Sequence, residues 1–226
     1  SGICLATLVS VRGSAPQVPG ASAIFSEQGL VAGTLGGGIM EGDARKKASE
    51  AIRNGNHLLY DFHLDAKSAD DEGALCGGSA TILLDPDPGM HAQCFREIYA
   101  SLEQGRPGWL VTTVSNQAES PIRRSWMEND PAIPVSLAVK QSTVPGGEHA
   151  EEQALKPDEE RVHASSSKQL EQWQERWPGL KESLSSAMDT GKCANLRNEA
   201  GDLMFIEPIF PLPKLVIAGA GHVGKA

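Results

Sequence analysis

The sequence has little of what several large protein classes require. Its 226 residues include only 4 Cys and no Cys-x-x-Cys pair, which excludes a disulfide framework and zinc fingers. No window approaches the roughly 18 uninterrupted apolar residues of a transmembrane helix, and the first residues show neither the basic start nor the long apolar stretch that we would expect of a signal peptide. The net charge of −9 argues against nucleic-acid binding, which needs cationic surfaces. We therefore expect an acidic, cytoplasmic protein that binds neither nucleic acid nor a membrane.

Glycine is abundant, with 24 Gly beside 14 Pro, and apolar runs alternate with glycine turns. Period-2 patterns and β-branched runs predict strands, and apolar residues at helical spacing predict helices. The expected strands cover 3–11, 21–25, 30–32, 58–62, 79–84, 109–114, 203–206 and 214–218, and the expected helices 40–53, 94–102, 170–177 and 180–188. Strands that alternate with helices indicate an α/β fold.

Composition divides the chain into three parts. We expect an amino-terminal mixed α/β domain over 1–114, an irregular linker with short helices over 115–200, and the start of a Rossmann-type doubly wound domain over 201–226. The stretch 141–172 has no aromatic residue and is rich in acids, as is typical of linkers. The chain lacks an initiator Met and stops just after a glycine turn, so we expect it to be a piece of a longer protein.

A glycine triplet, Gly36, Gly37 and Gly38, lies between an expected strand and an expected helix. Without Cβ atoms, its backbone amides can approach a phosphate, and a helix N-terminus favours the negative charge. Glu41 follows in the first helical turn, where it either accepts a hydrogen bond from a ligand or complements the helix dipole. The alternative interpretation is a tight turn without a ligand.

Cys76 precedes Gly77 and Gly78, which leave space around its sulfur. A thiolate near free amides has a lowered pKa and ligates a soft metal or accepts sulfur. The alternative is a small buried apolar side chain, which we expect for the other cysteines, Cys4, Cys94 and Cys193.

A third cluster, Gly219, Gly221 and Gly224, follows the strand expected over 214–218 and fits the dinucleotide-binding fingerprint. The helix and the acidic residue of that fingerprint would lie beyond residue 226. A Rossmann-like domain without a ligand is the alternative.

Taken in order, these motifs resemble those of the XdhC/CoxI family of xanthine dehydrogenase accessory proteins. The matching stretches are Ala6–Val9, Arg12–Pro16, Pro19–Ala21, Gly33–Gly38 with Glu41, Cys76–Gly78, Glu207–Pro208 and Pro213–Gly224. The stretch 115–200 matches no part of the family pattern. Gln17 departs from it, because a basic residue is common at that position.

The resemblance implies a molybdenum-cofactor chaperone rather than an enzyme. Such a protein binds and protects the molybdopterin cofactor, supports its sulfuration with a cysteine desulfurase, and inserts it into a xanthine dehydrogenase-type molybdenum hydroxylase. Cys76 would be the metal ligand, with Gly77 and Gly78 beside it. The glycine triplet and Arg12 would meet the phosphate, and Glu41 or Ser14 the pterin edge. A homodimer would suit so large a cofactor, although no motif requires one.

The alternative function is an NAD(P)-dependent oxidoreductase whose catalytic part lies outside this sequence. It rests on the 219–224 fingerprint alone, since no upstream motif supplies the acid–base pair of a hydride-transfer site. A dinucleotide bound to a Rossmann-type domain is compatible with either function.

Overall fold

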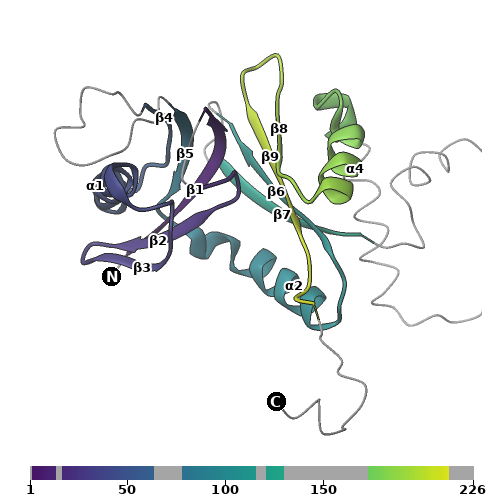
Figure 1. The fold of residues 1–226 in the computed structure, drawn as a ribbon, viewed down its shortest axis with the longest axis horizontal. Helices are drawn as coiled ribbons and strands as arrows, with labels where there is room; N and C mark the ends of the chain where they lie inside the picture. The colour runs from purple at the N-terminus through teal and green to yellow at the C-terminus, as the bar shows by residue number, and fades with distance from the viewer. Residues whose placement is uncertain (1, 14–16, 64–77, 116–120, 130–172, 214–226) are drawn as a thin grey trace, which may run out of the picture.

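Two antiparallel β-sheets organise the part of the chain that the computed structural model describes, residues 2–13, 17–63, 78–115, 121–129 and 173–213 (Figure 1). The larger sheet has the order β3-β2-β1-β5-β4 and the smaller one the order β7-β6-β9-β8. The strands are β1 (Ile3–Arg12), β2 (Ser22–Ser26), β3 (Gly29–Gly33), β4 (Leu58–His63), β5 (Ser79–Asp85), β6 (Gly108–Val114), β7 (Ile122–Glu128), β8 (Ala194–Arg197) and β9 (Leu203–Ile209). The helices with both ends in the described residues are α1 (Gly38–Asn54), α2 (Ala92–Glu103), α4 (Leu180–Thr190) and the short 3₁₀ helix η2 (Pro88–His91), and residues 173–176 are helical as well. The mixed α/β prediction is confirmed.

The larger sheet is built around β1, whose side chains alternate between two buried faces. Cys4, Ala6 and Leu8 point into the core beneath α1, and Val9 points into the core shared with the smaller sheet. A register shift between Leu8 and Ser10 marks a β-bulge in β1 opposite β5. The predicted hairpin is confirmed, since β2 and β3 pair across the turn at 26–29.

Helix α1 covers one face of this sheet through small side chains. Ala44, Ala48 and Ala51 are buried at helical spacing, as the sequence predicts. Their size lets the helix backbone lie close to β1, β2 and β5. The helix ends at Gly55, which is in the left-handed conformation and donates its N–H to the carbonyl of Ala51 at 2.8 Å.

The smaller sheet is covered on both faces. On one face α4 packs through Leu180, Leu184 and Ala187, and the indole N–H of Trp109 donates to the carbonyl of Leu184 at 2.9 Å. On the other face α2 packs against Leu110 of β6. In Figure 1 the two sheets lie between α1 on one side and α4 on the other.

The two sheets share one core. Val9 and Leu83 of the larger sheet pack with Val114, Leu203 and Phe205 of the smaller one. A buried ion pair also crosses between the sheets, because the guanidinium of Arg124 on β7 meets the carboxylate of Asp85 on β5, with side chains only 2% and 5% exposed. The described residues are therefore joined by apolar packing and by a specific polar contact.

The sequence-based interpretation needs correction in the second half of the chain. The stretch 115–200, expected to be an irregular linker with short helices, contributes β7 and β8 to the smaller sheet as well as α4. Strand β9, expected within the start of a Rossmann-type domain, pairs antiparallel with β6 and β8. The strand expected over 214–218 lies outside the described residues, so the Rossmann-type domain and the three domain boundaries stay predictions. Within the described ranges, no helix has the length and apolarity of a membrane span.

Candidate functional site

Strands β1, β3 and β4 run in the same direction, and we call the end of the larger sheet toward which they run the glycine-turn end. Arg12 ends β1 and pairs with Ser79, the first residue of β5. Ser79 also pairs with His63, the last residue of β4. Because β3 runs parallel to β1 and β4, its last residue, Gly33, points toward the same end. The turn that leads into α1 and the segment that precedes β5 therefore point the same way along the sheet, but not at the same level: Gly33 is level with Ala6 through Ala23, six residues before Arg12 on β1. At about 3.3 Å per residue, that offset is about 20 Å along the strand.

The backbone conformation of the glycine triplet explains why all three residues are glycine. Gly36, Gly37 and Gly38 have φ values of 108°, 73° and 61°, in a region that L side chains rarely adopt. A Cβ added at Gly37 or Gly38 would meet no atom within 4 Å, so the space above these two residues is open. The turn is therefore both strained for other residues and accessible to a ligand.

Glu41 holds this turn in place. Its Oε2 atom accepts the Thr34 hydroxyl at 2.7 Å and the backbone N–H groups of Leu35 at 2.9 Å and Gly37 at 3.3 Å. These hydrogen bonds, with the Thr34 hydroxyl first, lower the pKa of Glu41. Among the described residues, its other oxygen, Oε1, accepts no hydrogen bond. Ionised Glu41 therefore stabilises the turn through Oε2, and its Oε1 atom is available to a ligand.

Most backbone amides of the turn already donate hydrogen bonds within the protein, so few of them remain for the expected contact with a phosphate. The N–H of Gly36 donates to the Thr34 hydroxyl oxygen at 3.0 Å, and those of Leu35 and Gly37 donate to Glu41. The first intrahelical bond runs from Glu41 N–H to the carbonyl of Gly37. The N–H groups of Gly38 and of the next two residues remain for an anion, as at any helix N-terminus.

Arg12 is the cation at this end of the sheet. Its side chain is exposed at the end of β1 and forms no ion pair within the described ranges. Gly78 is buried directly before β5. Several other expected site residues lie outside the described residues: Ser14, Cys76, Gly77, Gly219, Gly221 and Gly224. Their roles, and the alternative function as an NAD(P)-dependent oxidoreductase, stay predictions.

The described cysteines are poor candidates for sulfur or metal chemistry. Burial raises the pKa of Cys4 to about 12 and that of Cys94 to about 11. Cys193 is half-buried, its thiol donates to the carbonyl of Pro19 at 3.3 Å, and its pKa is raised to about 12, chiefly by burial. Nor do the described residues contain a cluster of three or more His, Cys, Asp or Glu side chains that would hold a metal. The fourth cysteine, Cys76, lies outside the described residues, so its role as a reactive thiolate stays a prediction.

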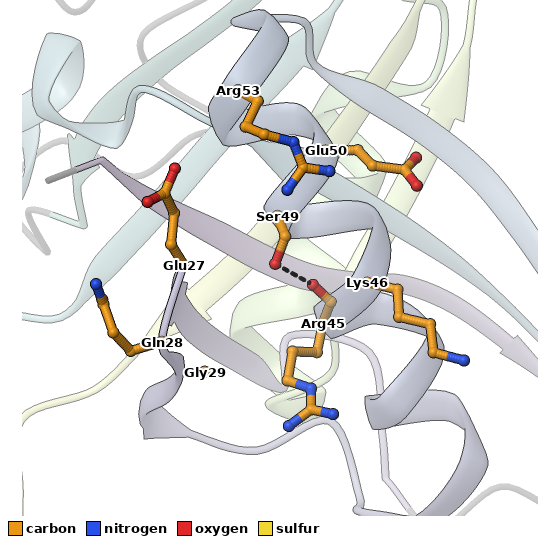
Figure 2. Close-up of a pocket in the computed structure, with 8 residues that line it drawn as sticks. All are labelled: Glu27, Gln28, Gly29, Arg45, Lys46, Ser49, Glu50 and Arg53. Carbon is orange, nitrogen blue, oxygen red and sulfur yellow. Dashed lines mark hydrogen bonds between the residues drawn. The ribbon is translucent and has the colours of Figure 1, made fainter.

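A charged pocket of about 400 Å³ at the other end of β3 has no counterpart in the sequence-based interpretation. It lies between the turn joining β2 to β3 and the outer surface of α1 (Figure 2). Its cations are Arg45, Lys46 and Arg53, and its acids are Glu27 and Glu50. The pairing of helix residues with a hairpin turn some 20 positions earlier leaves no local sequence signal. Because it opens opposite the glycine-turn end, this pocket is separate from the candidate site.

Comparison of the sequence with models of known families finds a match in the amino-terminal part of the chain. Residues 2–63, from β1 to the end of β4, match the model of the XdhC and CoxI family. The family resemblance is confirmed. The XdhC/CoxI segment contains Arg12, the glycine triplet and Glu41, and it ends before Cys76.

Structural comparison finds a crystal structure of a xanthine dehydrogenase from Bacillus halodurans, with 23% sequence identity and a TM-score of 0.47. The match covers 62% of this chain and 46% of that protein, so the chain spans about half of its length. A comparison with curated proteins found no match to this sequence.

Proposed function

We propose that this chain is a maturation factor for molybdenum hydroxylases of the xanthine dehydrogenase type. In this proposal it binds and protects the molybdopterin cofactor in the cytoplasm, supports its sulfuration with a cysteine desulfurase, and delivers it to the hydroxylase. The XdhC and CoxI family is linked to xanthine dehydrogenase maturation. The observation that carries the proposal is the glycine turn before α1, which is open above Gly37 and Gly38, is held by Glu41, and lies within the residues that match the family model.

The donors at the glycine-turn end fit the phosphate of such a cofactor. The free amides of the first turn of α1 offer neutral donors to an anion. The exposed guanidinium of Arg12, farther along β1, would be a charged donor to the same ligand only if the loop that follows it brings the two together. The open space above Gly37 and Gly38 gives that anion room to approach the backbone. Charge-assisted hydrogen bonds of this kind are about twice as strong as neutral ones, so this end of the sheet suits anion binding.

Two further contacts complete the proposed site. The free Oε1 of Glu41 would accept N–H groups from the pterin edge, with Ser14 as a second candidate for that contact. Cys76 would supply a soft sulfur ligand to molybdenum, and it precedes the buried Gly78 by only two residues. When bound, the cofactor supplies the metal on which an oxo ligand is replaced by a sulfido ligand.

Cofactor content tests this proposal directly. The protein is purified from a molybdenum-replete host, and bound pterin is measured by the fluorescence of its oxidised form. We expect pterin in the wild type, a loss of most of it in Cys76→Ser, and full retention in Cys94→Ser, since Cys94 packs with Ile98 and Leu110 between α2 and the smaller sheet. A wild-type protein that neither carries pterin nor takes up cofactor released from a hydroxylase would overturn the proposal.

A further inference from the structure

Another pocket, of about 190 Å³, lies at one end of the smaller sheet and has no part in the proposed function. The residues that line it include Thr113, Arg123, Trp173, Arg176, Trp177 and Asp202, and we call it the Trp173 pocket. It is smaller than the pockets of roughly 300–1,000 Å³ that hold drug-sized ligands, so its size suits a single flat ring system.

The Trp173 pocket lies on the face of the smaller sheet that α4 covers (Figure 1). On that face Val111 of β6 packs in one cluster with Trp177. Thr113 follows Val111 by two residues and therefore points the same way, and its partner in the sheet is Arg123 of β7. Val114, the next residue of β6, packs instead against the larger sheet. The pocket is therefore on the side of the smaller sheet that faces away from the larger sheet and its glycine turn.

Asp202 is a fixed, ionised carboxylate in the turn between β8 and β9, and it is only 3% exposed. Its Oδ2 atom accepts the guanidinium of Arg176 and, at 3.1 Å, the side-chain amide of Asn198. The backbone N–H of Asp202 donates in return to the side-chain oxygen of Asn198 at 2.9 Å. Burial by itself raises the pKa of Asp202, but hydrogen bonds from Arg176, Asn198 and Ser115 lower it below the ordinary value of 3.8.

The other oxygen of this carboxylate has no donor. Within the described residues, Oδ1 of Asp202 is buried and accepts no hydrogen bond. A buried acceptor without a donor costs free energy, and such groups in native proteins usually meet a water or a ligand. An ionised carboxylate only accepts hydrogen bonds, so the missing group is an N–H or an O–H donor. Since Asp202 lines the Trp173 pocket, a ligand in that pocket can supply the donor.

The other groups of the pocket suit a flat ring that carries a negative charge. Trp173 is half-buried and lines the pocket together with the buried Trp177, and indole rings stack on flat heterocycles. Arg123 is exposed and forms no ion pair within the described ranges. A guanidinium binds a phosphate or a carboxylate through paired N–H groups. The pocket thus combines a buried acceptor, an aromatic side and a cation at its rim.

We propose that the Trp173 pocket binds a flat nitrogen heterocycle that donates two neighbouring N–H groups to Asp202 and carries an anionic group at Arg123. Guanine nucleotides and pterins share this chemistry, because both rings have a ring N–H beside an amino group. Oδ1 has two lone pairs and can accept both donors. Adenine has a ring nitrogen acceptor beside its amino group, so one of its two atoms would face the carboxylate without a proton.

Isothermal titration calorimetry of the full chain tests the site with four probes: guanosine monophosphate, adenosine monophosphate, ribose 5-phosphate and pterin-6-carboxylate. We expect guanosine monophosphate or pterin-6-carboxylate to bind at least about tenfold more tightly than the other two probes. Tighter binding of guanosine monophosphate identifies a nucleotide as the source of the ring, and tighter binding of pterin-6-carboxylate identifies a pterin. Asp202 is left unchanged because it fixes the turn between β8 and β9, and the adenine probe tests its role instead.

Two variants assign the binding to this pocket. Trp173→Ala removes a stacking partner and should raise the dissociation constant about fivefold or more. Arg123→Gln removes the cation at the rim and should raise it about tenfold. Arg197→Gln is the matched control and should bind like the wild type, because Arg197 is an exposed arginine of the same sheet that does not line the pocket.

Three outcomes would overturn the proposal: equal binding of all four probes, no binding of either guanosine monophosphate or pterin-6-carboxylate, or an unchanged dissociation constant in Trp173→Ala or in Arg123→Gln. Binding in the Trp173 pocket does not rest on the proposed function. Cys76→Ser, which is expected to lose the cofactor, should bind the same probe as tightly as the wild type does. Either proposal can therefore fail without the other.

Discussion

Glu41 and Thr34 are joined by a hydrogen bond of 2.7 Å, seven residues apart, on the two sides of the glycine turn. The bond ties the first turn of α1 to the residue that follows β3, while the same carboxylate oxygen also accepts two backbone amides. One side chain thus fixes the conformation of the turn on which the proposed phosphate contact depends.

Replacing Glu41→Ala should destabilise the protein. The variant leaves the N–H of Leu35, a fully buried residue, without its acceptor, and losing a charged acceptor costs about 1–3 kcal/mol. Chemical denaturation measures the free energy of unfolding. Glu50→Ala, an exposed position on the same helix, is the control and should change it by less than about 0.5 kcal/mol. Equal effects of the two variants would show that Glu41 does not brace the turn.

The contribution of Glu41 to the free energy of unfolding should depend on pH in the acid range. Its pKa is lower in the folded protein than the ordinary value of 4.5, so its stabilisation is fully present above pH 4.5 and is lost as the pH falls through the folded pKa. The difference in unfolding free energy between wild type and Glu41→Ala should therefore shrink below pH 4.5. A difference that stays constant down to pH 3 would contradict this assignment.

Two glycine-to-alanine variants in the same region should change stability in opposite directions. At Gly37, with φ 73°, a Cβ clashes with its own backbone, so Gly37→Ala should cost about 1–2 kcal/mol. Gly42 lies within α1, and its Cβ would meet no atom within 4 Å, so Gly42→Ala should gain about 0.5–1 kcal/mol. Thermal unfolding of both variants measures the contrast, and a neutral Gly37→Ala would show that the turn adopts another conformation in solution.

Local patterns in the sequence predicted most elements of the larger sheet. The spacing of Ala44, Ala48 and Ala51 predicts the buried face of α1, and Gly55 predicts its end, because both signals are encoded within a few residues. Strand order and register depend instead on contacts between distant segments. The sequence therefore predicts a glycine turn before α1, but not that the strand leading into it is level with the middle of β1.

Strand β7 shows why the second half was harder to predict. The alternation of buried and exposed residues in β7 is hard to see in the sequence, because Arg123 and Arg124 are adjacent and both charged. Arg123 is exposed, whereas Arg124 is buried because Asp85, 39 residues earlier, neutralises it. Likewise, the sequence suggested that Glu41 complements the helix dipole or binds a ligand, and only coordinates could show its bonds to Thr34 and Leu35.

Glu207 on β9 should make the protein less stable at neutral pH than at acid pH. Burial raises its pKa from 4.5 to about 7, and the nearby Arg124 offsets this only in part. Because the folded pKa is higher, stability is greatest below pH 4.5 and falls as the pH rises toward 7. We expect Glu207→Gln to flatten this slope and to stabilise the protein at pH 8 by about 1–3 kcal/mol, at roughly 1.4 kcal/mol per pKa unit.

Denaturation curves at pH 4, 6 and 8 measure that slope. The groups facing Glu207 include Arg124 and Cys193, and Gly20 lies within reach of the same carboxylate, since its Cβ would be 3.7 Å from Oε1. Glu199→Gln, with its exposed side chain, is the control and should leave the slope unchanged. An identical slope in wild type and Glu207→Gln would show that Glu207 does not titrate in this range.

Substitutions at Arg124 and Asp85, which form a buried ion pair, should have non-additive effects on the free energy of unfolding. Arg124→Met leaves a buried carboxylate without its partner, and breaking such a pair costs about 3–5 kcal/mol. Arg123→Met, one residue away and exposed, should cost less than about 0.5 kcal/mol. The double variant Asp85→Asn/Arg124→Met should be less destabilised than the sum of its single variants, because it removes both buried charges together. Additive single and double effects in guanidinium chloride would mean that the two sheets are held together by their apolar core alone.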